Sequence, residues 1–271
     1  MTQNSFDQKK LSILGEINST EVDLSPKGTI DILCLPIIKL INSHPDMVTT
    51  SSCSGRISVF LEGTKSHNDE VKVGGKGQGG RWLFVSHDKE DVTGWFQRLI
   101  EGKLEEKITL STSNTGDIST FNGMTRYVLY KYEPFILHVK CRDFEVASRL
   151  YNTAMSCGFR ESGIGSNNLV AIRINIKLDV PIGYLDESND SLGLFVSEQY
   201  ISLLDEMTLT KFNDNSKKMT QLYNKIDKDI INQDNNAASM ISSHTETFEE
   251  RRQRKMKEGL EKQRKLKEAT Q

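Results

Sequence analysis

Apolar side chains alternate with other residues between residues 56 and 61, and this pattern limits the fold more than any other feature of the chain. Ile57, Val59 and Leu61 occupy every second position, which is the period of a β-strand that buries one face. A polar, glycine-dense stretch follows up to residue 80, and a second apolar run spans residues 81–86. The pattern predicts two strands joined by a long hairpin-like connection.

Similar patterns predict the other elements of the fold. Two more strands are expected on either side of Glu133 and Pro134, over residues 127–132 and 135–140, and another over residues 169–175. Apolar residues at helical spacing predict packing helices over residues 6–17, 91–100 and 143–158, and within residues 26–44. This irregular alternation predicts a mixed α/β (α+β) fold, with a compact mixed sheet and flanking helices.

The composition changes after residue 195, where helix-forming and charged residues dominate. We therefore expect a folded domain over residues 1–195, a helical appendage over residues 196–248, and a charged segment over residues 249–271. The charged segment has few apolar residues, so it is either a solvated helix or a disordered tail. Its basic residues could attract RNA. Alternatively, Glu residues four positions from Lys or Arg could form ion pairs with them in an exposed helix that has no partner.

Charge and hydropathy exclude several classes of protein. The chain has 35 Lys and Arg against 37 Asp and Glu, so its net charge of -2 offers no global attraction to nucleic acid, and any RNA contact must be local. No stretch approaches the roughly 20 apolar residues that a membrane span needs, and the first residues do not resemble a secretory signal. We expect a cytoplasmic protein that does not contact a membrane.

The four cysteines are far apart in the sequence. Cys34, Cys53, Cys141 and Cys157 form no CxxC pair, and no paired histidines accompany them at the spacing of a zinc site. We therefore expect free thiols and no metal site.

Residues 49–56 form the most unusual segment, because hydroxyl and thiol side chains are concentrated there before Gly55 and Arg56. Hydroxyl groups and backbone N–H groups of a glycine turn bind carboxylates or phosphates, and an arginine adds bidentate contacts. The segment is a candidate pocket wall. Alternatively, it is a serine-rich turn with an arginine on the surface.

A glycine cluster within residues 74–80 formally contains GxGxxG. A dinucleotide site requires this motif after a strand and before a helix, whereas here it precedes a strand, so we reject that function. No acidic residue ends a strand before GxG, which also counts against the common Rossmann-type methyltransferase fold. The cluster is either a mobile lid, with Lys76 and Arg81 as phosphate contacts, or a simple hairpin connection.

Two histidines are candidate general bases. His87 follows the second predicted strand, and His138 shares a strand face with Ile136 and Lys140. Either could instead be a merely solvated or hydrogen-bonded side chain. Trp82 could stack on a nucleobase, but its alternation with Phe84 favours packing in the core.

Four ordered blocks, residues 51–56, 82–87, 133–139 and 158–163, together resemble the signature of the wybutosine-synthesising methyltransferase family. The resemblance covers about residues 5–185. It implies a fold unlike the common methyltransferase and transfer of a methyl group from S-adenosylmethionine to N4 of the tricyclic wybutosine precursor. The substrate would be phenylalanine transfer RNA, modified next to its anticodon, with transient contacts to other enzymes of the pathway.

The resemblance and the residue types together give a set of candidate site residues. The candidate catalytic residues are His87 and His138. The candidate cofactor-binding residues are Ser52, Cys53, Ser54, Gly55, Arg56, Trp82 and Ser86. The candidate substrate-binding residues are Lys76, Arg81, Arg160, Ser162, Gly163 and Arg173.

Two other functions remain open at this point. A non-catalytic RNA-binding or assembly protein would use the serine and glycine loops to contact phosphates. A thiol-dependent enzyme would use Cys53 as its nucleophile, although nothing near it in the linear sequence supplies a base.

Overall fold

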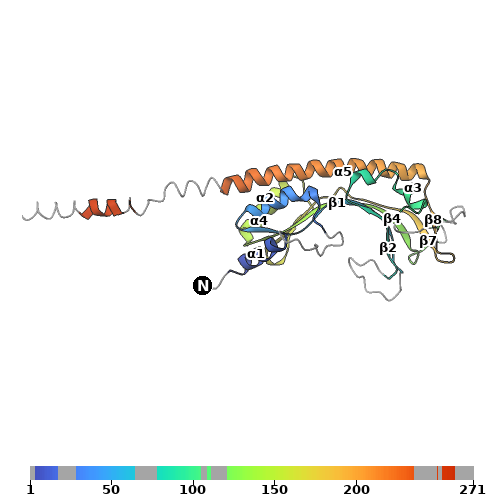
Figure 1. Cartoon of the computed structure of the whole chain (residues 1–271), viewed down its shortest axis with the longest axis horizontal. Helices are drawn as coiled ribbons and strands as arrows, with labels where there is room; N and C mark the ends of the chain where they lie inside the picture. Colours follow the sequence, from blue (N-terminus) through green and yellow to red (C-terminus); the bar gives the residue numbers. More distant parts are fainter. Residues whose placement is uncertain are drawn as a thin grey trace, which may run out of the picture. The chain divides into compact units, whose positions relative to one another are not determined.

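The computed structural model describes residues 4–17, 29–64, 78–104, 109–110, 121–234, 249 and 252–259. The chain divides into two units, Met1–Ile226 and Asp227–Gln271. In the first unit, helices α2, α3, α4 and α5 lie on one side of a large sheet, and α5 runs along it (Figure 1). The glycine cluster around Lys76 lies outside the described residues.

The sheet is built mainly from antiparallel strands. Its order is β2-β1-β4-β7-β8-β3, and β6 pairs with both β4 and β5. The short pair of β3 and β8 is parallel. The strands are β1 (Met47–Leu61), β2 (Arg81–Ser86), β3 (Thr109–Leu110), β4 (Tyr127–Cys141), β5 (Gly163–Ile164), β6 (Leu169–Arg173), β7 (Leu178–Asp186) and β8 (Ser191–Leu194). This order confirms the predicted mixed α/β fold and differs from a Rossmann sheet, in which most strands are parallel.

Among the described residues of the first unit, five α-helices and three 3-10 turns accompany the strands. The helices are α1 (Ser5–Ile17), α2 (Leu35–Ser43), α3 (Trp95–Ile100), α4 (Phe144–Ser156) and α5 (Glu198–Ile226). The 3-10 turns are Ile32–Cys34, Lys89–Asp91 and Ser166–Asn168. Helix α4 begins as predicted, because the Asp143 carboxylate accepts a hydrogen bond from the Val146 backbone N–H at 3.0 Å.

The main core lies between the sheet and its helices. Ile57, Val59 and Leu61 all point into it and are almost completely buried, which confirms the alternation in the sequence. Trp95 of α3 is fully buried in the same core, and its indole N–H donates to the Asp205 carboxylate of α5 at 2.8 Å. Helix α5 is therefore joined to the core by a polar contact as well as by apolar packing.

The structure differs from the predicted elements in three respects. The two strands expected on either side of Glu133 and Pro134 are one strand, β4, which pairs with β1 along most of its length. The helix expected over residues 91–100 is short, because Gly94 has a positive φ of 75° at its N-cap. The sequence pattern does not predict β7 or β8, since β7 carries Pro181 and β8 has four residues, nor the two-residue strands β3 and β5.

The second unit contains two described helical stretches, a π-helical turn over Asp227–Ile231 and a helix over residues 252–259. In the latter, Arg254 forms an exposed ion pair with Glu258 at 2.8 Å. The segment boundaries expected at residues 195 and 248 stay predictions. Within the described part of the chain, no helix is both long enough and apolar enough to cross a membrane.

Candidate functional site

The hydroxyl-rich segment lies in the middle of β1, where the strand bends. Gly55 has a φ of 103°, a conformation that side-chain-bearing residues rarely adopt. A Cβ atom at this position would lie 3.1 Å from the Glu133 carbonyl oxygen and 3.2 Å from Nδ2 of Asn215. Glycine is therefore required both by the backbone conformation and by the close approach of neighbouring atoms.

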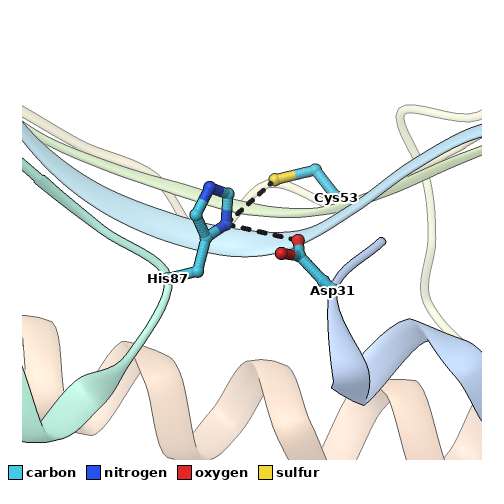
Figure 2. Close-up of side chains that lie close together, drawn as sticks. All are labelled: Asp31, Cys53 and His87. Atoms are coloured by element: carbon cyan, nitrogen blue, oxygen red, sulfur yellow. Dashed lines mark hydrogen bonds and ion pairs between the residues drawn. The ribbon is translucent and has the colours of Figure 1, made fainter. Parts of the chain in front are cut away.

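On one side of this bend, three chemically reactive side chains meet (Figure 2). Nδ1 of His87, which follows β2, lies 3.2 Å from Oδ2 of Asp31 and 3.8 Å from Sγ of Cys53. Asp31 is the N-cap residue of the first 3-10 turn, so the group joins three separate segments of the chain. We call Asp31, Cys53 and His87 the Asp-Cys-His group.

Asp31 is held firmly within this group. Its side chain is buried, and Oδ2 accepts hydrogen bonds from both the backbone N–H of Ser54 at 2.8 Å and the Ser54 hydroxyl at 3.1 Å. Hydrogen bonds from neutral donors favour the carboxylate form of an aspartate. A fixed negative charge therefore stands next to Nδ1 of His87.

This environment determines the charge of His87. The hydrogen bond to Asp31, assisted by the contact with Cys53, raises the pKa of His87 to about 9, although partial burial opposes the shift. At neutral pH the side chain is an imidazolium whose Nδ1–H faces Asp31. Its other nitrogen, Nε2, lies on the opposite side of the ring, away from the Asp31 carboxylate and the Cys53 thiol (Figure 2).

His138 occupies a different environment on β4. It stands opposite Ser51 of β1 and Ala171 of β6. Nδ1 lies 2.8 Å from the Ser51 hydroxyl, and Nη2 of Arg173 lies 3.5 Å from Nε2. Burial, together with the Arg173 charge, lowers the pKa of His138. Because arginine can only donate, Nε2 is the acceptor and Nδ1–H is the donor to Ser51.

The two histidine environments are neighbours along β1. Ser51 stands opposite His138 and Cys53 stands opposite Ile136, without a register shift between these pairs. Since alternate residues of a strand share a face, Ser51 and Cys53 lie on the same face about 7 Å apart. A charged imidazole and a neutral imidazole thus flank the same segment of β1.

Beyond the bend, Arg56 and Trp82 form a third feature. Nε of Arg56 donates to the Glu133 carboxylate at 2.6 Å, and the guanidinium lies 5.2 Å from the centre of the Trp82 ring. Phe60 packs against the same indole at 4.9 Å. Trp82 is only half-buried and does not belong to the core, because the β-bulge between Val59 and Phe60 separates its position from that of Phe84.

Next to this feature, the Ser58 hydroxyl is buried and has no hydrogen-bond partner among the described residues. Ser58 lies two residues after Arg56 and stands opposite Lys131 of β4. A buried hydroxyl without a partner costs free energy, and such groups commonly mark places where a water or a ligand binds.

Several other predicted site residues are used for internal contacts. The Ser86 hydroxyl donates to the Asp91 carboxylate at 2.6 Å and accepts from the backbone N–H of Asp88 at 3.0 Å. The Ser54 side chain is buried against Asp31. Ser52 and Cys53 remain partly exposed on β1.

Four of the six predicted substrate-binding residues lie around β5 and β6. The Ser162 hydroxyl accepts from the Arg173 backbone N–H at 3.1 Å, and Gly163 stands opposite Ala171. Arg160 is exposed in the turn before β5. Arg81 lies apart from them, at the start of β2 opposite Leu61, and Lys76 falls outside the described residues.

Sequence reasoning missed three residues of the site. Asp31, Glu133 and Asn215 contact the hydroxyl-rich segment or its neighbours, but none lies near it in the sequence. Asp31 precedes an apolar turn and Asn215 sits within a charged helix, so neither carries a local signal. Glu133 precedes Pro134, and this pair predicts a break between two strands where the structure has one continuous strand.

Cysteine, histidine and aspartate are also the residue types that bind zinc, and one atom of each lies within 4.8 Å of the others in the Asp-Cys-His group. However, Oδ2 of Asp31 already accepts two hydrogen bonds from Ser54 and faces the His87 imidazolium. We therefore treat the three residues as a hydrogen-bonded group.

Comparison with known proteins places the chain in a family. The family model described as Methyltransferase TYW3 matches residues 8–228, which include both histidine environments and all of α5. The tRNA wybutosine-synthesizing protein 3 of Saccharomyces cerevisiae is 63% identical over 266 residues, covering 98% of this chain and 97% of that protein. The Schizosaccharomyces pombe protein of the same name is 38% identical over 229 residues, covering 83% and 88%.

A solved structure shares the fold. The PH1069 protein of Pyrococcus horikoshii OT3 superimposes with a TM-score of 0.57 and 27% identity, over 83% of this chain and 95% of that one. The family match extends over far more than half of the 271 residues. The chain therefore belongs to the Methyltransferase TYW3 family.

Proposed function

We propose that this protein transfers a methyl group from S-adenosylmethionine to N4 of the tricyclic wybutosine precursor, next to the anticodon of phenylalanine transfer RNA. The observation that carries the proposal is the family match over residues 8–228, which contains every candidate site residue. The names of the relatives point to the same pathway. The geometry of the site supports methyl transfer because a neutral base on β4 and the cationic groups His87 and Arg56 are grouped around the same strand, β1.

The residues around Arg56 fit a cofactor of this kind. When bound, S-adenosylmethionine supplies an electrophilic methyl group on a sulfonium centre. The half-buried Trp82 offers an aromatic surface for a purine, and the buried Ser58 hydroxyl has no hydrogen-bond partner within the described part of the chain. The Arg56 guanidinium contacts Glu133 through Nε, and its fork has further N–H groups that can bind a carboxylate.

Of the two histidines, His138 is the better general base. The acceptor nitrogen of the substrate carries a proton that must leave during methyl transfer, so the base has to be neutral beforehand. Burial and Arg173 lower the pKa of His138, whereas Asp31 raises the pKa of His87 to about 9. We assign proton abstraction to Nε2 of His138, which exchanges its long 3.5 Å contact with Arg173 for the substrate N–H, and a cationic binding role to His87.

The exposed residues around β5 and β6 are suited to the RNA. Arg160 and Arg173 are both exposed, and Arg173 also contacts His138. Phosphate contacts from arginine hold a nucleic acid in register without reading its sequence. We propose that these two arginines, with Ser162 and Gly163, position the modified anticodon loop near His138.

The test is methyl transfer onto transfer RNA from cells that lack this protein. The purified chain and S-adenosylmethionine are added, and the modified nucleoside is measured by mass spectrometry. We expect a gain of one methyl group on the tricyclic base, and no gain when S-adenosylmethionine is omitted. If the chain binds this RNA but neither binds the cofactor nor methylates the base, the protein is a non-catalytic RNA-binding protein and the proposal is wrong.

A further inference from the structure

We propose that Asp31 is a positioning residue that orients His87, so that Nε2–H of His87 donates to an anionic oxygen of a bound ligand, either a carboxylate or a phosphate. This inference deepens the proposed function and rests on it, because the ligand is taken to be the cofactor or the RNA. Neither the resemblance nor the comparisons assign a role to Asp31.

The contacts of Nδ1 set the direction in which the His87 imidazole points. Asp31 faces Nδ1 at 3.2 Å, and the Cys53 thiol approaches the same nitrogen at 3.8 Å. Two partners at one nitrogen fix the rotation of the ring. Nε2 is then left on the opposite side, away from Asp31 and Cys53 (Figure 2). In an imidazolium both nitrogens are donors, so Nε2 presents an N–H group.

The Asp31 side chain is itself held in place by Ser54. Two hydrogen bonds from Ser54 hold Oδ2, and the side chain is buried. Ser54 belongs to the hydroxyl-rich segment of β1, so the same strand that contributes Cys53 also anchors the partner of His87. A carboxylate–histidine pair of this kind sets both the tautomer and the orientation of the ring.

The charge and accessibility of His87 indicate which kind of ligand it binds. His87 is the cationic member of the group, and its side chain is 21% exposed, so a ligand can reach it. Cys53 lies on the same face of β1 as Ser51, which contacts the proposed base His138. An anionic group bound at His87 would therefore lie on the side of β1 that also carries the contact between Ser51 and His138.

The experiment has one arm for the orientation of His87. Nitrogen-15 NMR of the full-length protein follows both ring nitrogens of His87 as pH is raised. The wild-type ring should stay protonated at neutral pH and titrate near 9, and Asp31→Asn should move the midpoint down toward 6.5. Asp88→Asn is the matched control, because Asp88 is adjacent and exposed but has no contact with the ring among the described interactions.

The second arm identifies the anion. S-adenosylhomocysteine carries a carboxylate and methylthioadenosine does not, and their affinities are compared by calorimetry in wild type and His87→Gln. If the anion is the carboxylate, the variant should lose affinity for S-adenosylhomocysteine by about 10- to 100-fold, while methylthioadenosine binding stays the same. If it is a phosphate, the variant should instead show a weaker dependence of transfer RNA affinity on salt. The slope of log affinity against log salt concentration should become shallower by about 0.7–0.9.

Three results would overturn the inference. The first is a wild-type His87 that is neutral at neutral pH, which can be seen without any variant and so does not depend on how Asp31→Asn folds. The second is unchanged binding of both ligand classes in His87→Gln. The third is stoichiometric zinc in the purified protein that is lost on Cys53→Ser, since the metal would then occupy Nδ1. None of these measurements uses methyl transfer. A failure of the proposed reaction can therefore be distinguished from a failure of the inference about Asp31 and His87.

Discussion

Asn215 of α5 donates a 2.7 Å hydrogen bond from Nδ2 to the backbone carbonyl of Ser54, 161 residues earlier in the chain. Its Oδ1 accepts a 2.8 Å hydrogen bond from the backbone N–H of Phe135 on β4. One buried side chain of the long helix thus forms hydrogen bonds with backbone groups of both β1 and β4, at the place where β1 bends at Gly55. Helix α5 is in this way part of the architecture of the site.

Replacing Asn215 by alanine should destabilise the protein. The Ser54 carbonyl and the Phe135 N–H would lose their side-chain partner inside the core, at about 1–3 kcal/mol for each unsatisfied group. Urea unfolding measures the change in the free energy of unfolding. Asn213→Ala is the matched control, because Asn213 lies two residues away on the same helix and is exposed. Equal stabilities of the two variants would contradict this account.

This contact also shows where prediction from the sequence reaches its limit. The alternation of apolar and polar residues correctly predicts that Ile57, Val59 and Leu61 lie in the core. It also correctly predicts that His138 and Leu137 lie on opposite faces of β4. These are local patterns, and local patterns determine which face of a strand is buried.

The partners of these residues depend on pairing between distant segments. Asp31 reaches Ser54 across 23 residues and Glu133 reaches Arg56 across 77, and neither separation follows any periodic rule. The polarity of Asn215 gave no indication that it is buried, because a lone asparagine in a charged helix is usually exposed. The resemblance of the four sequence blocks identified the family, whereas the contacts among them required the fold.

Arg56→Ala should weaken binding of the cofactor or the RNA by about 1.5–3 kcal/mol, the range for a lost hydrogen bond to a charged group. The effect on stability should be smaller, about 0–1 kcal/mol, because the ion pair with Glu133 is partly exposed. Calorimetry with S-adenosylhomocysteine and thermal unfolding separate the two effects. Glu133→Gln serves as the control, since it removes the ion pair but keeps the guanidinium. Normal affinities in a folded Arg56→Ala variant would exclude Arg56 from binding.

His138→Gln should slow methyl transfer by about 100- to 10,000-fold, as expected when a general base is removed. Glutamine keeps the polarity and much of the size of histidine, so cofactor affinity should stay near normal. Single-turnover kinetics at saturating RNA measure the chemical step. His44→Gln is a control, because His44 lies at the end of α2 and is no candidate for the reaction. A turnover equal to wild type would mean that positioning alone carries the reaction.

The pH dependence of stability should report on the Asp31–His87 pair. The pKa of His87 is raised from 6.5 to about 9 in the folded protein, chiefly by the hydrogen bond to Asp31. A raised pKa means that the folded state binds the proton more tightly than the unfolded state does. The stabilisation is therefore complete below about pH 6.5 and is lost as the pH rises toward about 9.

Unfolding of wild type and His87→Gln at several pH values measures this stabilisation. The difference between their free energies of unfolding cancels most contributions from other titrating groups. It should be largest below pH 6.5 and shrink steadily as the pH approaches 9. A difference that is independent of pH would show that His87 carries no extra charge in the folded state.

Removal of residues 249–271 should leave RNA binding unchanged. Of the 35 basic and 37 acidic residues, nine and five lie in this segment, so it carries a net charge of +4 and leaves the remainder at -6. An acidic remainder is a poor partner for a polyanion, which would favour a role for the segment in RNA binding. Arg254, however, already pairs with Glu258 at 2.8 Å, and both side chains are more than half exposed.

Ion pairs between residues four apart let an exposed helix satisfy its own charges without a partner. We therefore expect the full chain and a truncation after Phe248 to show the same dependence of transfer RNA affinity on salt. Each phosphate contact that the truncation removed would instead flatten the logarithmic slope by about 0.7–0.9. Cofactor affinity provides the internal control and should be equal in both proteins, because all candidate site residues precede residue 174. A flatter slope with unchanged cofactor affinity would assign the segment to RNA binding.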